Sequence, residues 1–393
     1  MKRLTILVII LAMLSTILAS CAKPKETVDL KVWGSQEDQA MLQKMIDEFK
    51  TANTDAIYNI TLGVVGEGDA MARFLEDPAA AADVFQFSND QILDLVAAGA
   101  LYEVTRNKNA IVSANMSSAI EAATVNDKLY AYPSTADNGY FLYYDKSVFS
   151  EEDVKSLDKM LEVAAAKNKK VFMDVSNGWY IASFFLGAGG TLTIKDGKQV
   201  TDFNNEKGVM AGEAIKAFTA HAAFLTGDDA VLTGGIGDTI AAGVSGTWNA
   251  EAISAKLGSN YAATKLPTFN LGGTQTQMSS FAGFKLVGVN SQTKSPVAAM
   301  TLAEWLTNEK NQITRFETRQ MGPANIKAAE SDAVKANIAL AALAMQNQYA
   351  VSQKEVLGSY WGPAEAFGTE MEAKNYTKTV KEMLDEMVSQ IQQ

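Results

Sequence analysis

Short β-branched segments alternate with amphipathic helical segments, and this alternation constrains the fold more than any other feature of the chain. Residues 28–33, 57–65 and 83–87 have the composition of strands. Residues 39–50 lie between the first two, and their apolar side chains share one helical face: Met41, Leu42, Met45, Ile46 and Phe49. Such alternation favours α/β layering around a mostly parallel sheet.

The same alternation continues to the end of the sequence without an internal repeat or a long linker. Residues 140–144, 171–175 and 244–248 resemble strands, whereas residues 207–224 and 380–391 have helical spacing. A length of 393 residues corresponds to two or three domains of ordinary size. We therefore expect an α/β protein of two lobes that are joined by more than one crossover.

Composition and charge exclude several classes of function. The formal net charge is −11, and it becomes −13 when residues 1–20, which contain Lys2 and Arg3 but no acid, are removed. So acidic a chain argues against nucleic acid and against electrostatic docking on anionic lipid. The single cysteine and the single histidine, His221, exclude an internal disulfide, a Cys-rich metal site and a multi-histidine centre. We expect no metal and no cofactor.

Residues 1–20 have the features of a lipoprotein signal peptide. Lys2 and Arg3 precede an apolar run over residues 4–18, which is too short to span a membrane comfortably. Leu18-Ala19-Ser20-Cys21 looks like a bacterial lipobox, where a lipid is attached to the cysteine thiol. The alternative is an ordinary secretory signal with a chance cysteine. We expect acyl chains such as palmitate to hold the mature chain at the outer face of the cytoplasmic membrane.

Known catalytic motifs are absent from the sequence. The glycine cluster at residues 234–238 has Ile240 at the last glycine position of GxGxxG and no following GK[ST]. A GxSxG nucleophile elbow is also missing. We interpret acidic pairs such as Asp228-Asp229 as solvated faces or helix caps. The sequence therefore predicts a binding protein rather than an enzyme.

Several segments, in order along the chain, resemble the extracellular solute-binding proteins of ABC transporters, particularly the maltose/maltodextrin-binding type. The segments that carry the resemblance are the lipobox, Leu30-Lys31-Val32-Trp33, residues 82–90, Ala97-Ala98-Gly99-Ala100-Leu101-Tyr102, Lys128-Leu129-Tyr130-Ala131-Tyr132-Pro133, Tyr143-Tyr144-Asp145-Lys146, Leu266-Pro267, Phe281-Ala282-Gly283, Pro323-Ala324-Asn325 and Tyr360-Trp361-Gly362-Pro363. The resemblance covers nearly the whole chain.

The resemblance implies two α/β lobes with a ligand cleft between them that closes by a hinge motion. Signal peptide 1–20 and a lipidated tether, 21–27, would precede the lobes. Lobe one would hold residues 28–136 and 284–322, and lobe two residues 137–283 and 323–393. The implied partners are an oligosaccharide and ABC permease subunits. We expect the protein to be a monomer.

Four aromatic residues match family positions that stack on sugar rings, whose C–H faces are apolar. They are Phe87, Trp179, Trp248 and Trp361. The alternative for each ring is core packing. The three tryptophans lie beside glycines in loop-like segments rather than on periodic apolar faces, which favours the stacking role.

Polar contacts to sugar hydroxyls are expected from five further residues. Asp90 matches a family acid, although it could instead cap a helix. Asp137 lies where lobe one crosses into lobe two, and the alignment could shift this role to Asn138. Gln36 and Glu37 follow the first strand, where the family places polar contacts. The family's basic contact next to Asp90 is replaced by Gln91, so the preferred length and linkage of the glucan stay open.

The sequence thus predicts a lipid-anchored binding protein that delivers maltose or maltooligosaccharides, which are α-1,4-glucans, to an ABC permease. A binding protein for another oligosaccharide is the close alternative. A surface glycoside hydrolase would need two carboxylates across the cleft, one with a raised pKa. An adhesive surface protein without transport partners also stays open.

Overall fold

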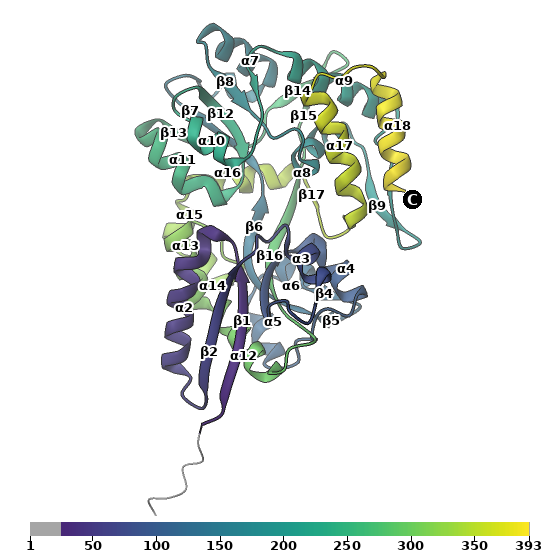
Figure 1. The fold of residues 1–393 in the computed structure, drawn as a ribbon. Helices are drawn as coiled ribbons and strands as arrows, with labels where there is room; N and C mark the ends of the chain where they lie inside the picture. Colours follow the sequence, from purple (N-terminus) through teal and green to yellow (C-terminus); the bar gives the residue numbers. More distant parts are fainter. Residues whose placement is uncertain (1–24, 393) are drawn as a thin grey trace, which may run out of the picture.

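The structure is a computed structural model that describes residues 25–392. Residues 1–20, Cys21 and the start of the tether lie outside the described residues. Two lobes, drawn one above the other in Figure 1, are joined by long strands that run between them. The predicted two-lobed α/β fold is confirmed. Among the described helices, none combines the length and the apolar character that a membrane span requires.

The lobe-one sheet is mixed rather than mostly parallel. Its strands are β1 (Thr27–Gly34), β2 (Ile57–Val64), β3 (Val84–Ser88), β6 (Ala131–Gly139), β16 (Ser280–Val289) and β17 (Ala350–Ser352). The order is β17-β16-β3-β1-β2, and β6 pairs with β16. β1 is parallel to β2 and β3, but β16 is antiparallel to both β3 and β6. The return strand β16 enters from lobe two in the direction opposite to β3 and β6, and its other neighbour, β17, is parallel to it.

Helices cover the lobe-one sheet, and α2 does so with the face that the sequence predicts. They are α2 (Gln39–Ala52), α3 (Ala70–Glu76), α4 (Ile92–Ala97), α5 (Lys108–Ala114), α6 (Ser117–Ala122), α12 (Pro296–Leu306) and α13 (Glu309–Arg319), with a small hairpin of β4 (Thr124–Val125) and β5 (Lys128–Leu129). α2 buries the five apolar residues of its predicted face, and α3 ends before Asp77-Pro78 as the turn signal indicates.

Lobe two has its own five-stranded sheet in the order β11-β8-β12-β7-β13. The strands are β7 (Phe141–Asp145), β8 (Lys170–Phe172), β11 (Phe224–Leu225), β12 (Ile240–Ser245) and β13 (Tyr261–Thr264), and two hairpins add β9 (Leu192–Lys195) with β10 (Lys198–Thr201) and β14 (Thr268–Leu271) with β15 (Thr274–Gln277). The strand predicted to reach Trp248 ends at Ser245, and Trp248 lies in the 3-10 turn η4 (Thr247–Asn249). The turn takes the indole out of the sheet.

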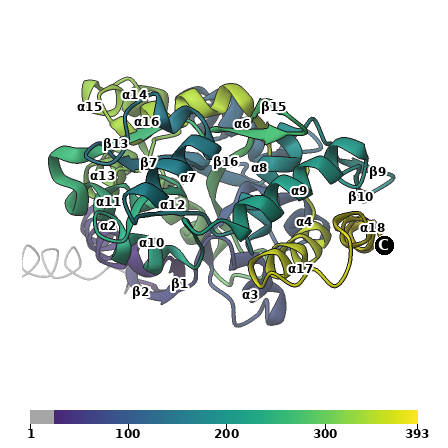
Figure 2. The same ribbon diagram turned by 90° about the horizontal axis from the view of Figure 1, so that it is seen from above.

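The remaining α-helices lie after residue 156. They are α7 (Leu157–Ala166), α8 (Gly178–Gly187), α9 (Glu206–Ala220), α10 (Asp229–Gly235), α11 (Ala250–Leu257), α14 (Ile326–Ala329), α15 (Asp332–Lys335), α16 (Ile338–Gln346), α17 (Trp361–Glu372) and α18 (Val380–Ile391). α17 and α18 pack beside α8 and α9 (Figure 2). α18 begins with a capping box of Thr379 and Glu382 and buries its predicted face.

Each lobe has a hydrophobic core assembled from separate stretches of sequence. The lobe-one core uses residues 28–132 and 286–306, and the lobe-two cores use residues 140–281 and 339–391. β6, β16 and the segment around Gly322 pass between these cores, and Pro323 forms a β-bridge with Thr135 of β6. The predicted boundaries at 136/137, 283/284 and 322/323 stay predictions, and the three crossing segments contain them.

Candidate functional site

A cavity of about 610 Å³ is lined by residues of both lobes. Six of the nine ligand-contact residues predicted from the sequence line it: Glu37, Asp90, Asn138, Trp179, Trp248 and Trp361. The three tryptophans come from α8, the η4 turn and the start of α17. Their neighbouring glycines, Gly178, Gly246 and Gly362, mark the loop-to-helix junctions where these rings emerge.

Two of the tryptophans form one aromatic surface on lobe two. The rings of Trp179 and Trp248 are 5.8 Å apart between centroids and tilted by 39°. Trp179 follows Asn177, whose side chain caps α8 by accepting a hydrogen bond from the Trp179 backbone N–H at 3.0 Å. All three tryptophans are partly buried against the lobe-two core, so their free faces border the cavity.

Buried tyrosines support the backbone that carries these rings. Tyr140 donates its hydroxyl to the Trp179 carbonyl at 2.8 Å, Tyr360 to Gly178 at 2.9 Å, and Tyr143 to Gly246 at 3.0 Å. Burial raises the pKa of each of these three phenols well above its ordinary value. The phenols therefore stay protonated and act as fixed donors to the loops that hold the rings.

The acidic pair at the start of α10 divides into two roles. The Asp228 side chain accepts a hydrogen bond from the Val231 backbone N–H at 3.1 Å, which is the helix cap that the sequence suggests. Asp229 lines the cavity and accepts a hydrogen bond from Trp248 Nε1 at 2.9 Å. Burial raises the pKa of Asp229, and the indole N–H opposes that shift. The interpretation of this pair as a cap or a solvated face is corrected for Asp229.

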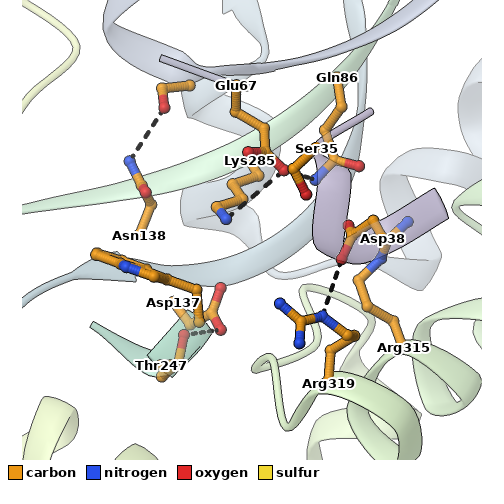
Figure 3. A network of polar contacts seen from close by, with 12 residues as sticks. Ser35, Asp38, Glu67, Gln86, Asp137, Asn138, Thr247, Lys285, Arg315 and Arg319 are labelled. Carbon is orange, nitrogen blue, oxygen red and sulfur yellow. Dashed lines mark hydrogen bonds and ion pairs between the residues drawn. The ribbon is translucent and has the colours of Figure 1, made fainter. Parts of the chain in front are cut away.

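Lobe one contributes a polar wall from the loop that follows β2. Gln91 holds this loop by donating from Nε2 to the backbone carbonyls of Glu67 at 2.7 Å and Gly68 at 3.0 Å. The Glu67 carboxylate accepts a hydrogen bond from Gln86 Nε2 at 2.9 Å and lies 3.7 Å from Lys285 Nζ. Figure 3 shows Glu67, Gln86 and Lys285 gathered on the side of the site opposite Asp137 and Thr247.

Lys285 of β16 supplies a cation to the cavity. Its ammonium lies 5.5 Å from the centroid of the Trp248 ring on the other lobe, within reach of a cation–π contact. Only 6% of Lys285 is exposed. In the family that the sequence resembles, a basic contact lies next to the position of Asp90, where this chain has Gln91. The cavity instead receives its basic group from a different strand.

A relay of hydrogen bonds links the two lobes through Gln353, which follows β17. Trp179 Nε1 donates to Gln353 Oε1 at 3.0 Å, and Gln353 Nε2 donates to Asp90 Oδ1 at 2.9 Å. Burial raises the pKa of Asp90 to about 7, although the Gln353 hydrogen bond works in the opposite direction. Asp90 therefore gains a proton far more readily than an exposed aspartate.

Three predicted residues do not reach the cavity, and their placement corrects the expectation. Phe87 is fully buried in the lobe-one core, where its ring lies 5.6 Å from that of Phe85. It lies on a strand that is covered on both faces, which the motif match could not show. Gln36 is exposed in the turn η1 (Gln36–Asp38) and does not line the cavity.

Asp137 lies on the crossing strand β6 as predicted, but its carboxylate serves the junction between the lobes. Its Oδ2 accepts hydrogen bonds from Thr247 Oγ1 and from the Gly322 backbone N–H, both at 2.6 Å. Asp137 is 1% exposed and does not line the cavity. The neighbouring Asn138 lines the cavity instead, and its Nδ2 donates to Ser88 Oγ at 3.5 Å. The alternative alignment, which places the contact at Asn138, fits the geometry.

Sequence reasoning missed several residues that line the cavity: Glu67, Asp69, Tyr180, Asp229, Lys285, Arg319, Gln353 and Glu365. A signal existed for Glu67 and Asp69, because Gly66-Glu67-Gly68-Asp69 follows a strand of the parallel part of the sheet, and ligands bind at such carboxyl ends. No sequence signal marks Lys285 or Gln353, which the topology of β16 and β17 brings to the cavity.

Comparison with known proteins finds relatives that align over most of this chain. A solved structure described only as being with acarbose is 31% identical, with a TM-score of 0.84 over 94% of this chain and 99% of that chain. The galactooligosaccharide-binding protein of Bacillus subtilis (strain 168) is 28% identical over 391 residues, covering 90% of this chain and 89% of its relative. The unliganded maltodextrin-binding protein of L. casei BL23 is 25% identical, with a TM-score of 0.77 over 93% and 99% of the two chains.

The family comparison extends over most of the described lobes. The sequence profile of the bacterial extracellular solute-binding proteins matches residues 44–342, which include most of both lobe sheets and the segments that carry Glu67, Trp179 and Trp248. Two of the relatives are named as binding proteins, and the matching family is described as extracellular. On this match, the chain belongs to the bacterial extracellular solute-binding protein family.

Proposed function

We propose that this protein captures an oligosaccharide between its lobes and delivers it to the permease subunits of an ABC importer. The observation that carries the proposal is the pairing of Trp179, Trp248 and Trp361 with a wall of charged and amide side chains in one cavity. Aromatic rings cover the apolar face of a sugar, and carboxylates, amides and ammonium groups bind its hydroxyl rim. A wholly apolar ligand would leave the polar wall unpaired.

The preferred ligands are maltose and maltooligosaccharides. Three rings from three separate elements suit a curved α-1,4-linked chain better than a flat β-1,4-linked one, and relatives of this chain include a maltodextrin-binding protein and a structure with acarbose. A galactooligosaccharide is the second candidate, because the Bacillus subtilis relative is named for that class and aligns over 90% of this chain.

The proposed mechanism is hinge closure without chemistry. β6 and β16, which are paired to each other, would bend as the lobes close on the sugar. A glycosidase would need an acid such as Asp90 opposite a second carboxylate at a catalytic separation, whereas the relatives that are named for a function are binding proteins. We propose a monomer that binds its ligand and catalyses no reaction.

Calorimetric titration with maltotriose, cellotriose and β-1,4-galactotriose tests the assignment. We expect micromolar binding of maltotriose, which corresponds to about −8 kcal/mol, and much weaker binding of cellotriose. Tight binding of galactotriose alone would replace the first candidate by the second. Binding of none of the three would contradict the sugar assignment, and release of reducing sugar during the titration would contradict the absence of catalysis.

We also propose that a lipid on Cys21 anchors the mature protein outside the cytoplasmic membrane. The support is the sequence Leu18-Ala19-Ser20-Cys21 behind an apolar segment, with no other cysteine in the chain. Cys21→Ala should move the protein from the membrane fraction to the medium and abolish its labelling by radioactive palmitate. A variant that stays in the membrane fraction with unchanged label would contradict the anchor.

A further inference from the structure

We infer that Lys285 determines which sugar the cleft accepts: its ammonium and the Glu67 carboxylate together bind two adjacent hydroxyls of the ring that stacks on Trp248. The inference rests on the proposed function and names a contact within the same site. The structure supports it through the burial of Lys285, the free capacity of Glu67, and the position of both groups facing an aromatic ring.

Lys285 is a buried cation whose hydrogen-bonding capacity is unused. Only 6% of the residue is exposed, and within residues 25–392 its ammonium makes no hydrogen bond. Its one ion pair, with Glu67 Oε1, spans 3.7 Å and is too long to be a hydrogen bond. An ammonium group has three N–H donors. Lys285 lines the cavity, so a ligand oxygen there could accept from them.

Glu67 can take part in the same contact as an acceptor. Gln86 Nε2 donates to its Oε1 at 2.9 Å, and within the described chain Oε2 has no hydrogen-bond partner. The Gln91 amide fixes the backbone on either side of this carboxylate. The carboxylate is therefore held in place beside the ammonium and keeps one oxygen for a ligand hydroxyl.

The Trp248 ring determines where the ligand's hydroxyls would lie. It faces Lys285 from the other lobe, 5.5 Å from the ammonium to the ring centroid, and Asp229 holds its indole N–H at 2.9 Å. Because the ammonium lies over the indole face, a sugar ring that stacks there would displace it toward the hydroxyl rim, beside the Glu67 carboxylate. One hydroxyl can accept from Lys285 Nζ while its neighbour donates to Glu67, because the two charged atoms lie 3.7 Å apart.

The strand geometry explains why Lys285 points into the cavity. In the pairing of β16 with β6, the register shifts on both sides of Lys285, between Gly283 and Lys285 and between Lys285 and Leu286. Irregularities of this kind redirect a side chain from the regular alternation of a strand. Lys285 consequently reaches the cleft from a strand whose following residues, Leu286 and Val287, belong to the lobe-one core.

A simpler role for Lys285 would be to hold the lobes together through Trp248, and this role makes a different prediction. A tether changes the closing equilibrium, so its loss would weaken all ligands by the same factor. A group that binds particular hydroxyls affects only ligands that carry those hydroxyls. Analogues that lack single hydroxyls therefore separate the two roles.

The experiment titrates wild type and Lys285→Met with maltotriose, β-1,4-galactotriose and monodeoxy analogues of each. We expect wild type to bind one parent sugar and to lose roughly tenfold to hundredfold affinity for the analogues that lack either of two adjacent hydroxyls. Lys285→Met should bind the parent sugar more weakly by a similar factor. It should no longer distinguish the parent from the analogue that lacks the hydroxyl accepting from Nζ.

Lys265→Met is the matched control. Lys265 is also partly buried and also lies over an aromatic ring, that of Tyr349 at 4.8 Å, but it does not line the cavity. This variant should keep the wild-type ranking of the analogues. Glu67→Gln provides a second test that preserves size, and it should weaken the response to the hydroxyl that donates to the carboxylate.

The outcomes separate the inference from the function on which it rests. If wild type binds neither parent sugar, the proposed function fails. If wild type binds a sugar but Lys285→Met loses the same factor for the parent and for every analogue, Lys285 is only a tether and the inference is overturned. If Lys285→Met does not fold, as judged by thermal melting, an unchanged analogue ranking in Glu67→Gln overturns it.

Discussion

The two walls of the cavity are built from different chemistry and are held in place by different means. The lobe-two wall presents tryptophans, and buried tyrosine hydroxyls fix the backbone that carries them. The lobe-one wall presents charged side chains on loops and strands, and amide groups such as Gln91 and Gln86 fix their positions. An apolar ring needs only a backbone that holds it in position. A charged side chain that is removed from water also needs hydrogen-bond or ion-pair partners.

Because of this difference, we expect substitutions in the two walls to have different effects on binding and on stability. Removing a ring from lobe two should reduce the surface offered to a ligand while the rest of the wall stays in place. Removing one member of a charged pair in lobe one should leave a buried charge without compensation and affect folding itself. The predictions below test this contrast in order of decreasing effect.

The largest effect is expected from Asp38→Ala, beneath the lobe-one wall. Asp38 is fully buried and accepts hydrogen bonds from Arg315 Nη1 at 2.8 Å and from Arg319 Nε at 3.1 Å (Figure 3). Breaking a buried pair typically destabilises a protein by about 3–5 kcal/mol, and chemical denaturation would measure the loss. The control, Lys310→Met, removes an exposed pair with Glu48 and should cost less than about 1 kcal/mol. Equal losses of unfolding free energy in the two variants would contradict the expected difference between a buried and an exposed ion pair.

The next effect is a pH dependence of stability that arises from Asp90. Burial raises its pKa in the folded protein to about 7, so the folded state holds this proton more tightly than the unfolded chain. The contribution to stability is therefore present below about pH 4 and is lost as the pH rises to about 7. Asp90→Asn should remove the dependence and become more stable than wild type at pH 8, by about 2–4 kcal/mol. Parallel denaturation curves at pH 4 and pH 8 test this, and the same pH response in both proteins would show that Asp90 ionises normally.

The ring-bearing wall should respond in binding more than in folding. Trp361→Ala removes a ring that lines the cavity, and loss of a large apolar contact corresponds to about 1.5–3 kcal/mol, or roughly tenfold to hundredfold in Kd. The contrasting variant is Trp305→Ala. The Trp305 indole packs against the lobe-one core and donates to the Met45 carbonyl at 2.9 Å.

Paired melting curves and titrations distinguish these two tryptophans. Trp305→Ala should lose about 3 kcal/mol of stability and keep its affinity, and Trp361→Ala should show the opposite pattern. If Trp361→Ala melts early and still binds the sugar normally, its ring belongs to the core and the aromatic wall is misassigned.

The smallest effect should come from an ion pair between the lobes at the edge of the cavity. Arg319 Nη1 lies 3.6 Å from Glu251 Oε2, and 59% of the Glu251 side chain is exposed. Exposed pairs contribute about 0.2–1 kcal/mol, so Glu251→Gln should weaken ligand binding less than about fivefold. The difference should vanish in 1 M salt because of screening. A larger, salt-independent loss would show that Glu251 holds the lobes in another way.

The sequence predicted structure best where a short local pattern is compatible with only one structural role. The helical face of α2 and the tryptophans beside glycines depend on neighbours a few residues away, so local pattern was sufficient to place them. Phe87 failed because a motif match says which strand carries a residue but not which face of the strand is covered. Trp248 reached the cavity only because β12 stopped three residues earlier than its composition suggested.

The charged half of the site could not be predicted, since chain topology assembles it. Lys285 lies 218 residues after Glu67, and Gln353 lies 263 residues after Asp90. Nothing near Lys285 in sequence distinguishes it from a lysine at an exposed strand position. Its direction follows from the irregular pairing of β16 with β6, which no local pattern contains.

The central place of β16 in the lobe-one sheet has a consequence for the order in which the chain can fold. β3 and β6 are both paired to β16, so before residue 289 has been synthesised the sheet consists of β1, β2 and β3, and β6 has no strand partner. Lobe one therefore cannot be completed while the chain emerges, and the contacts that close it span about half of the sequence. Such non-local contacts slow folding. A nascent chain that stays incomplete until its last third is made can be threaded through a translocation channel before its first domain closes.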